Sequence, residues 1–197
     1  MKLFNWSTIR LVLMFSLVIF LYSFTSNRNN NRKLTKSVVV FVGDDAPYIN
    51  QETVNKLLIE NNKDAKSIGK DKLDLNRLEK RLNSHEMIEK SDVFVSIDGV
   101  MKAVVKQKTP VARVFDGDNS FYIDYKGNRM PLSANYTARV PLVSGVINKK
   151  NREKLAEFFR IMYDDEFLKK NIIGVQIMPN GSLKLLNRNY NYQMILR

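Results

Sequence analysis

The sequence has no cysteine, and its 197 residues include a single histidine and a single tryptophan. The missing cysteines exclude disulfide bonds, thiolate metal sites, a cysteine nucleophile and a cysteine-linked lipid anchor. The motifs of serine hydrolases, zinc metalloproteases and P-loop nucleotide-binding proteins are also missing. We therefore expect a binding protein without catalytic, cofactor-binding or metal-binding residues, and not an enzyme.

Acidic residues are missing from the beginning of the chain. Residues 1–36 contain no Asp or Glu but six basic residues, Lys2, Arg10, Arg28, Arg32, Lys33 and Lys36. They supply half of the net charge of +12, and charges of both signs are interspersed over the rest of the chain. Basic charge beside an apolar segment favours membrane phosphates over nucleic acid as the partner.

One uncharged apolar run lies in this basic region. It extends from Leu11 to Phe24, with Trp6 and Tyr22 near its ends, and with its flanks it reaches about twenty residues, enough to cross a bilayer. We predict a transmembrane helix over residues 9–26 after a tail of residues 1–8. Its lipid-facing side chains would be Leu11, Val12, Leu13, Met14, Phe15, Leu17, Val18, Ile19, Phe20 and Leu21.

A cleaved signal peptide is the competing interpretation of this run. The stretch after Phe24 is a poor cleavage site, which favours a retained anchor, and both interpretations export the residues that follow. A count of the basic residues on the two flanks alone would favour the orientation that does not export the residues after the run. Residues 27–36 are polar and predict a linker.

Residues 37–108 predict a small α+β domain. The expected elements are a strand at Ser37–Val42, a helix at Gln51–Glu60 after a possible Asn50 cap, a helix after Asp74, a strand at Asp92–Ile97 and a strand at Val100–Lys108. Asp98-Gly99 predicts a tight turn between the last two strands. This β-α-α-β-β order is typical of a POTRA module, in which two helices cover one face of a three-stranded sheet.

Residues 109–197 predict a mainly antiparallel β-domain with one long helix. The helix is expected from Asn151 to about Lys170, followed by strands at Ile172–Met178, Leu183–Leu186 and Tyr190–Leu196. Pro179–Ser182 predicts the turn between the first two of these strands.

Three polar features point weakly to chemistry. Asp116, Asp118 and Asp124 form an oxygen-rich loop, but the spacing of an EF-hand is not met, which favours a polar hairpin tip. Asp44 and Asp45 precede a proline and are typical turn residues. His85 has no catalytic partner nearby in the sequence, and we expect it at the surface near a helix end.

Two segments resemble a known family. Residues 87–115 (MIEKSDVFVSIDGVMKAVVKQKTPVARVF) and 121–146 (FYIDYKGNRMPLSANYTARVPLVSGV) are similar to the FtsQ/DivIB family of bacterial cell-division proteins, in its Bacteroidetes-type branch. The second segment carries Phe121, Tyr122 and Asp124, then Met130–Ser133, then the Arg139–Gly145 stretch. Compared with the family pattern, the chain is expected to lack the extreme C-terminus.

The resemblance implies a single-pass protein of the inner membrane at the division septum, with a cytoplasmic N-terminus and the bulk of the chain in the periplasm. It implies a scaffold that binds FtsB and FtsL, with FtsW/FtsI-type septal synthases as further partners, and that binds neither nucleic acid nor a small-molecule substrate. The partner contacts are predicted on the third POTRA strand and on the terminal strand, at Met101, Lys102, Val104, Lys106, Tyr190, Tyr192, Met194 and Ile195.

Two other classes stay open. An outer-membrane assembly or secretion component would also use a POTRA module, but it would need repeated modules or a barrel. A cell-envelope protein, catalytic or not, would use the Asp116–Asp124 loop.

Overall fold

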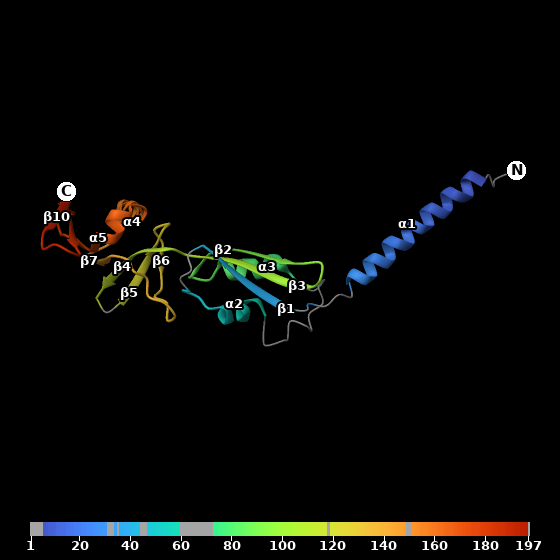
Figure 1. Cartoon of the computed structure of the whole chain (residues 1–197), viewed down its shortest axis with the longest axis horizontal. Helices are drawn as coiled ribbons and strands as arrows, with labels where there is room; N and C mark the ends of the chain where they lie inside the picture. The colour runs from blue at the N-terminus through green and yellow to red at the C-terminus, as the bar shows by residue number, and fades with distance from the viewer. Residues whose placement is uncertain are drawn as a thin grey trace.

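The structure is a computed structural model of the whole chain, and it describes residues 6–30, 34, 36–43, 47–59, 73–117, 119–148 and 151–196. Helix α1 (Trp6–Asn30) stands at one end, and two folded lobes follow it in line (Figure 1). The first lobe is built on a three-stranded sheet and the second on a seven-stranded sheet. The chain is therefore an α+β protein with an apolar N-terminal helix, as predicted.

Helix α1 has no protein packed around its apolar side chains. It spans 25 residues, which is about 37 Å at 1.5 Å per residue. None of the stretch Trp6–Arg28 is buried inside the protein, and by length and composition this helix is able to cross a membrane.

The polar linker predicted at residues 27–36 is shorter than expected. Helix α1 continues to Asn30, and Leu34 is already 2 % exposed and packed in the core of the first lobe. Residues 31–33 and 35 lie outside the described residues. The helix and the first lobe are therefore joined by a short connection.

The first lobe has the predicted β-α-α-β-β order. Its elements are β1 (Lys36–Val42), α2 (Gln51–Leu58), α3 (Leu75–Asn83), β2 (Ile88–Val95) and β3 (Val100–Gln107). Asn50 caps α2 by accepting a hydrogen bond from the Thr53 N–H at 2.8 Å. Asp74 caps α3 by accepting one from the Arg77 N–H at 3.0 Å. These caps fix where the helices begin, because the first N–H groups of a helix lack partners within it.

Strand β3 is the central strand of the first sheet. Strand β1 pairs with it in parallel, with Lys36 opposite Val100, and β2 pairs antiparallel on the other side. The free edges of this sheet therefore belong to β1 and β2. Strand β3 can offer a partner its face but no edge.

The second lobe is a seven-stranded sheet with two helices. Its elements are β4 (Pro110–Asp116), β5 (Asn119–Asp124), β6 (Arg129–Met130), β7 (Leu142–Ser144), α4 (Arg152–Asp164), α5 (Glu166–Asn171), β8 (Ile172–Ile177), β9 (Leu183–Asn187) and β10 (Gln193–Leu196). The strand order is β10-β9-β8-β7-β4-β5-β6. Strand β7 pairs in parallel with β4 and with β8, and the other pairs are antiparallel.

The single long helix predicted in this lobe is instead two helices. The backbone of Asp165 is extended between α4 and α5, and its carboxylate accepts a hydrogen bond from the Leu168 N–H at 2.8 Å. Asp165 therefore acts as an N-cap that starts a new helix. Asn151 makes no side-chain cap for α4, because its side-chain oxygen accepts from the Asn148 N–H instead.

The two lobes share part of their hydrophobic core. The core of the first lobe includes Tyr122, Met130 and Ala138 from the second lobe. A separate core lies between α4 and the second sheet and includes Phe159 and Val175. The first core therefore extends across the junction and fixes the lobes to each other.

Candidate partner-binding surfaces

The first sheet has one open face, opposite the face that packs into the core. Lys102 is exposed there, and Phe94 on the neighbouring strand is 45 % exposed. Val104 is half-buried. Lys106 is also exposed, but its Nζ lies 3.2 Å from Glu89 Oε1. Met101 is 1 % exposed and belongs to the core, contrary to the prediction that it contacts a partner.

The terminal strand β10 is an edge strand of the second sheet. It pairs with β9 alone, with Ile195 opposite Lys184. The side chains of Ile195 and Leu196 are 64 % and 44 % exposed. Met194 is half-buried and packs against the core under α4. The edge therefore combines backbone groups that can pair with a further strand and apolar side chains that can pack on it.

The predicted terminal strand is shorter than expected at its beginning. Tyr190 and Tyr192 precede β10, which begins at Gln193. Their rings stack on each other at 5.5 Å between centroids, and the Tyr192 hydroxyl accepts a hydrogen bond from the Asn187 side chain at 3.1 Å. Local stacking therefore holds the two tyrosines in a bend beside the edge, where both remain more than half exposed.

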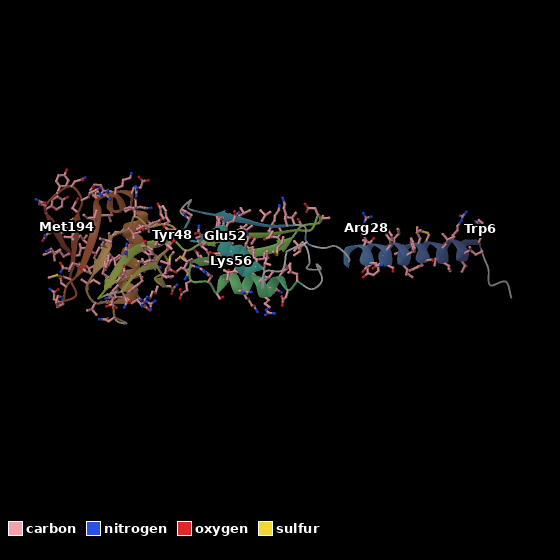
Figure 2. All side chains as sticks on the ribbon, turned by 90° about the horizontal axis from the view of Figure 1, so that it is seen from below. Trp6, Arg28, Tyr48, Glu52, Lys56 and Met194 are labelled. Carbon is pink, nitrogen blue, oxygen red and sulfur yellow. The ribbon has the colours of Figure 1, made fainter. Side chains whose placement is uncertain are left out.

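The chain after Glu166 carries basic charge only. The last acidic residue of the sequence is Glu166, and five basic residues follow it, Lys169, Lys170, Lys184, Arg188 and Arg197. Met194 lies at this end of the molecule, and Trp6 lies at the other end (Figure 2). Charge complementarity therefore favours a partner segment that carries carboxylates.

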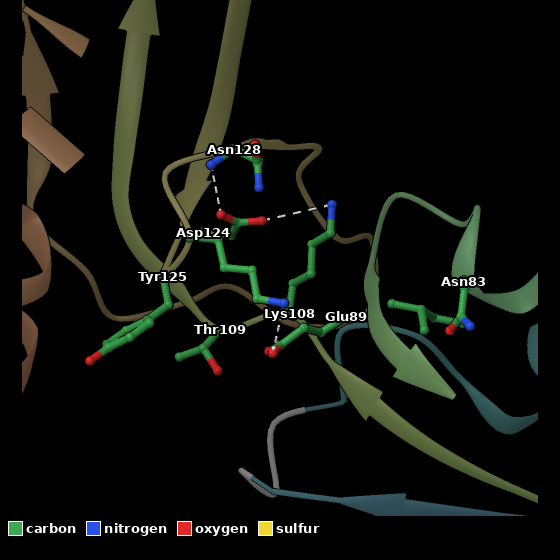
Figure 3. A pocket seen from close by; sticks show the side chains of 9 residues that line it. Asn83, Glu89, Lys108, Thr109, Asp124, Tyr125 and Asn128 are labelled. Atoms are coloured by element: carbon green, nitrogen blue, oxygen red, sulfur yellow. Dashed lines mark hydrogen bonds and ion pairs between the residues drawn. The ribbon is translucent and has the colours of Figure 1, made fainter. Parts of the chain in front are cut away.

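A polar cavity of about 190 Å³ lies at the junction of the two lobes (Figure 3). It is lined from both lobes by Asn83, Ile88, Glu89, Lys108, Thr109, Asp124, Tyr125, Lys126 and Asn128. Glu89 Oε1 lies 3.2 Å from Lys106 Nζ and 3.3 Å from Lys126 Nζ. The contact with Lys126 joins β2 of the first lobe to the β5–β6 turn of the second.

Two opposing effects act on the Glu89 carboxyl. Burial alone would raise its pKa, but the hydrogen bonds from Lys106 and Lys126 outweigh burial and lower the pKa below its ordinary value. Glu89 therefore stays ionised at neutral pH and holds both lysines. Sequence reasoning missed this contact, because nothing in the sequence marks two residues so far apart as neighbours.

Asp124 has a structural role in the β5–β6 turn. Its side chain is 3 % exposed, and Oδ1 accepts a hydrogen bond from the Asn128 N–H at 2.7 Å. Oδ2 lies 3.8 Å from Lys108 Nζ. Asp116 lies at the other end of the β4–β5 hairpin, opposite Asn119. The oxygen-rich loop considered in the sequence therefore does not bring Asp116 and Asp124 together.

The remaining polar residues considered in the sequence are three aspartates and His85. Asp118, Asp44 and Asp45 lie outside the described residues. His85 is half-buried just after α3, and its Nδ1 accepts a hydrogen bond from the Met87 N–H at 3.2 Å. Burial lowers the pKa of His85, with a smaller lowering effect of Lys108 and an opposing effect of Glu86.

The motif residues between Phe121 and Gly145 fix the architecture of the second lobe. The buried Tyr122 hydroxyl accepts a hydrogen bond from the Ala138 N–H at 3.1 Å. The Arg129 guanidinium lies 4.0 Å from the centroid of the Phe121 ring. A Cβ at Gly145, whose φ is +104°, would lie 2.5 Å from the Ile177 carbonyl oxygen. The motif residues therefore serve the packing and the backbone geometry of the second lobe.

Comparisons with known proteins assign this lobe to a family. Residues 109–196 match the family model described as FtsQ/DivIB, C-terminal related. Among solved structures, the chain is similar to the major extracytoplasmic domain of the trans isomer of the bacterial cell division protein DivIB from Geobacillus stearothermophilus. That similarity has 13 % identity, covers 45 % of this chain and 77 % of that chain, and has a TM-score of 0.35.

A comparison with curated proteins finds no match. The family match confirms the resemblance to FtsQ/DivIB that the motifs predict. Residues 109–196, which make up the second lobe, therefore match the FtsQ/DivIB C-terminal related family.

Proposed function

We propose that this protein is a membrane-anchored scaffold of the bacterial cell-division machinery and not an enzyme. The family match over residues 109–196 supports a role in cell division. The observation that carries the binding role is the exposed edge of β10, which lies inside the matched region. An edge strand can bind an extended partner segment through main-chain hydrogen bonds and alternate side-chain contacts.

The proposed organisation follows the chain outward from the cytoplasm. Residues 1–8 form a cytoplasmic tail, residues 9–26 span the inner membrane within α1, and a short connection after Asn30 leads to the first lobe. Residues 37–108 are the POTRA domain and residues 109–197 the β-domain, both in the periplasm at the division septum. The exposed apolar helix α1 and the β-α-α-β-β order of the first lobe support this organisation.

The proposed partners are FtsB and FtsL, with FtsW/FtsI-type septal synthases as further members of the assembly. An extended segment of a partner adds to β10, contacts Ile195 and the two tyrosines, and brings carboxylates to basic residues such as Lys184, which lies opposite Ile195. Lys102, Val104 and Lys106 on the open face of the first sheet form a second contact surface.

The test compares two exposed isoleucines in the full-length, tagged protein, purified from dividing cells in detergent. Ile195→Lys places a charge on the β10 edge, and Ile161→Lys places the same charge on α4, where the side chain is 56 % exposed. FtsB and FtsL should co-purify with the wild type and with the Ile161 variant. The Ile195 variant should lose them, by about tenfold or more if the contact contributes about 1.4 kcal/mol or more.

Two results would contradict the proposal. Equal recovery of the small division proteins by both variants would show that the β10 edge is not the docking site. Recovery of no division protein by the wild type would remove the scaffold role itself. Circular dichroism of both variants checks that each has folded.

A further inference from the structure

The tip of the β2–β3 hairpin lies at the end of the first lobe where the chain arrives from α1. The parallel register places Lys36, the first residue of β1, opposite Val100, the first residue of β3. The antiparallel register places Val95, the last residue of β2, opposite Met101. Residues 96–99 therefore project beyond the sheet beside the start of β1, on the side nearest α1 (Figure 1).

The connection between α1 and this end of the lobe is short. Leu34 is 2 % exposed and held in the core, so only residues 31–33 separate it from Asn30. Three residues bridge about 14 Å at full extension between the flanking Cα atoms. If α1 spans the bilayer, the end of the lobe that carries the hairpin tip cannot move far from the membrane surface.

The tip presents an apolar side chain on a rigid turn. Ile97 is 83 % exposed, the largest exposed fraction among the large hydrophobic side chains of the described residues. The Gly99 N–H donates to the Ser96 carbonyl at 3.0 Å, and the Ser96 hydroxyl donates to the Val100 carbonyl at 2.9 Å. A prearranged turn loses little conformational freedom when its tip binds a surface.

The charges near the tip suit an anionic surface. Asp98 is the one acid of the turn, and Lys102 and Lys36 are the cations near it. The two lysines leave the tip with net positive charge. In the sequence, Arg28, Arg32 and Lys33 add further positive charge between the apolar run and the lobe.

We propose that the β2–β3 hairpin tip rests on the lipid bilayer, with Ile97 inserted at the boundary between headgroups and acyl chains and Lys36 and Lys102 at the lipid phosphates. An apolar side chain flanked by cations is the combination that binds an anionic membrane surface. This second contact, beside the anchor, holds the first lobe in a defined orientation. It rests on the membrane anchor of the proposed function.

The cysteine-free sequence allows a direct test with single spin labels. Ile97→Cys carries the label at the tip, and the matched control is Val146→Cys, a 73 % exposed apolar side chain in a loop of the second lobe. Phe20→Cys marks the middle of α1. Each full-length protein is reconstituted into vesicles of phosphatidylethanolamine and phosphatidylglycerol, and collisions with oxygen and with a water-soluble nickel complex give the depth of the label.

The expected result is a label at position 97 about 5–10 Å inside the headgroup boundary, with the label at 146 in water and the label at 20 in the bilayer core. The double variant Lys36→Gln, Lys102→Gln should reduce the depth of the label at 97 in anionic vesicles. The same pair should have less effect in phosphatidylcholine vesicles, where the lipid carries no net charge.

Each contrary outcome has its own meaning. A label at 97 as exposed to nickel as the label at 146, with position 20 still in the bilayer core, overturns the tip contact and leaves the anchor intact. Protection of 97 from nickel without greater access to oxygen indicates contact with protein and also overturns it. A water-exposed label at position 20 overturns the anchor, and the tip contact with it.

Discussion

The Ser133 hydroxyl donates a 2.6 Å hydrogen bond to the carbonyl oxygen of Tyr48. Ser133 follows β6 in the second lobe, and Tyr48 precedes α2 in the first. The Tyr48 ring also meets the Tyr136 ring edge-on, with 5.5 Å between centroids. The motif that reveals the family in the sequence, Met130–Ser133, therefore forms part of the joint between the lobes.

Ser133→Ala should destabilise the full chain. The variant leaves the Tyr48 carbonyl without this donor and also removes the acceptor of the Asn135 N–H, at an expected cost of about 1–3 kcal/mol. Denaturant unfolding in detergent measures the difference. Ser144→Ala, at an exposed serine of β7, should change stability by about 0.5 kcal/mol or less. Equal effects of the two substitutions would contradict the role of Ser133.

Tyr122→Phe should loosen the segment that follows β6. Tyr122 is 1 % exposed, and its hydroxyl is the acceptor for the Ala138 N–H, so its loss should cost about 1–3 kcal/mol. Hydrogen exchange should show faster exchange of the Ala138 amide. Tyr125→Phe removes an exposed hydroxyl that donates to Asp164, and it should leave the Ala138 exchange rate unchanged.

Gly127→Ala should be more harmful than Gly181→Ala. The two glycines have nearly equal positive φ angles, +82° and +85°, so both substitutions share a backbone cost of about 1–2 kcal/mol. A Cβ at Gly127 would lie 2.7 Å from the Cβ of Ala156 on α4, whereas a Cβ at Gly181 meets nothing within 4 Å. Overpacking should add about 1–3 kcal/mol at Gly127 alone. Equal thermal midpoints would show that the β5–β6 turn does not pack tightly on α4.

The Glu89–Lys126 ion pair should couple the lobes measurably. In a double-mutant cycle of Glu89→Gln and Lys126→Met, we expect a coupling free energy of about 0.2–1 kcal/mol. The contact crosses from β2 to the β5–β6 turn, so additive effects would mean that it does not stabilise the joint. Lys90→Met, at a lysine whose partner Asp92 is on its own strand, is the control.

The same carboxylate predicts a pH dependence with a definite sign. The folded-state pKa of Glu89 is below the ordinary 4.5, so the folded chain binds fewer protons there than the unfolded chain. Its contribution is complete above pH 4.5 and is lost as pH falls through the folded-state pKa. The stability difference between wild type and Glu89→Gln should therefore shrink on acidification. A difference independent of pH would contradict the lowered pKa.

The elements of the first lobe could be predicted because their signals are local. Asn50 and Asp74 cap helices in the structure as their positions suggest, and the residues of β3 alternate between a buried side with Ala103 and Val105 and an open side. Alternation shows which side of a strand is buried but not which strands flank it. The central position of β3 was therefore not predictable in this way.

The misjudged boundaries in the second lobe have physical causes. Apolar spacing runs on through Asp165 with Leu168, but the Asp165 carboxylate competes for a backbone N–H and divides the helix. Tyr190 and Tyr192 favour a strand by composition, yet ring stacking holds them in the bend before β10. The contacts of the junction, such as Glu89 with Lys126, depend on the meeting of two lobes and leave no periodic pattern.

The parallel pairing of β1 with β3 sets an order of events during folding. Strands β2 and β3 are joined by a tight turn and can form a hairpin by themselves, within microseconds for an isolated hairpin. Strand β1 follows helix α1 closely but pairs with residues that are 64 positions later in the chain. It must therefore wait until that hairpin has left the ribosome. The strand synthesised first in this sheet is consequently the last to be incorporated into it.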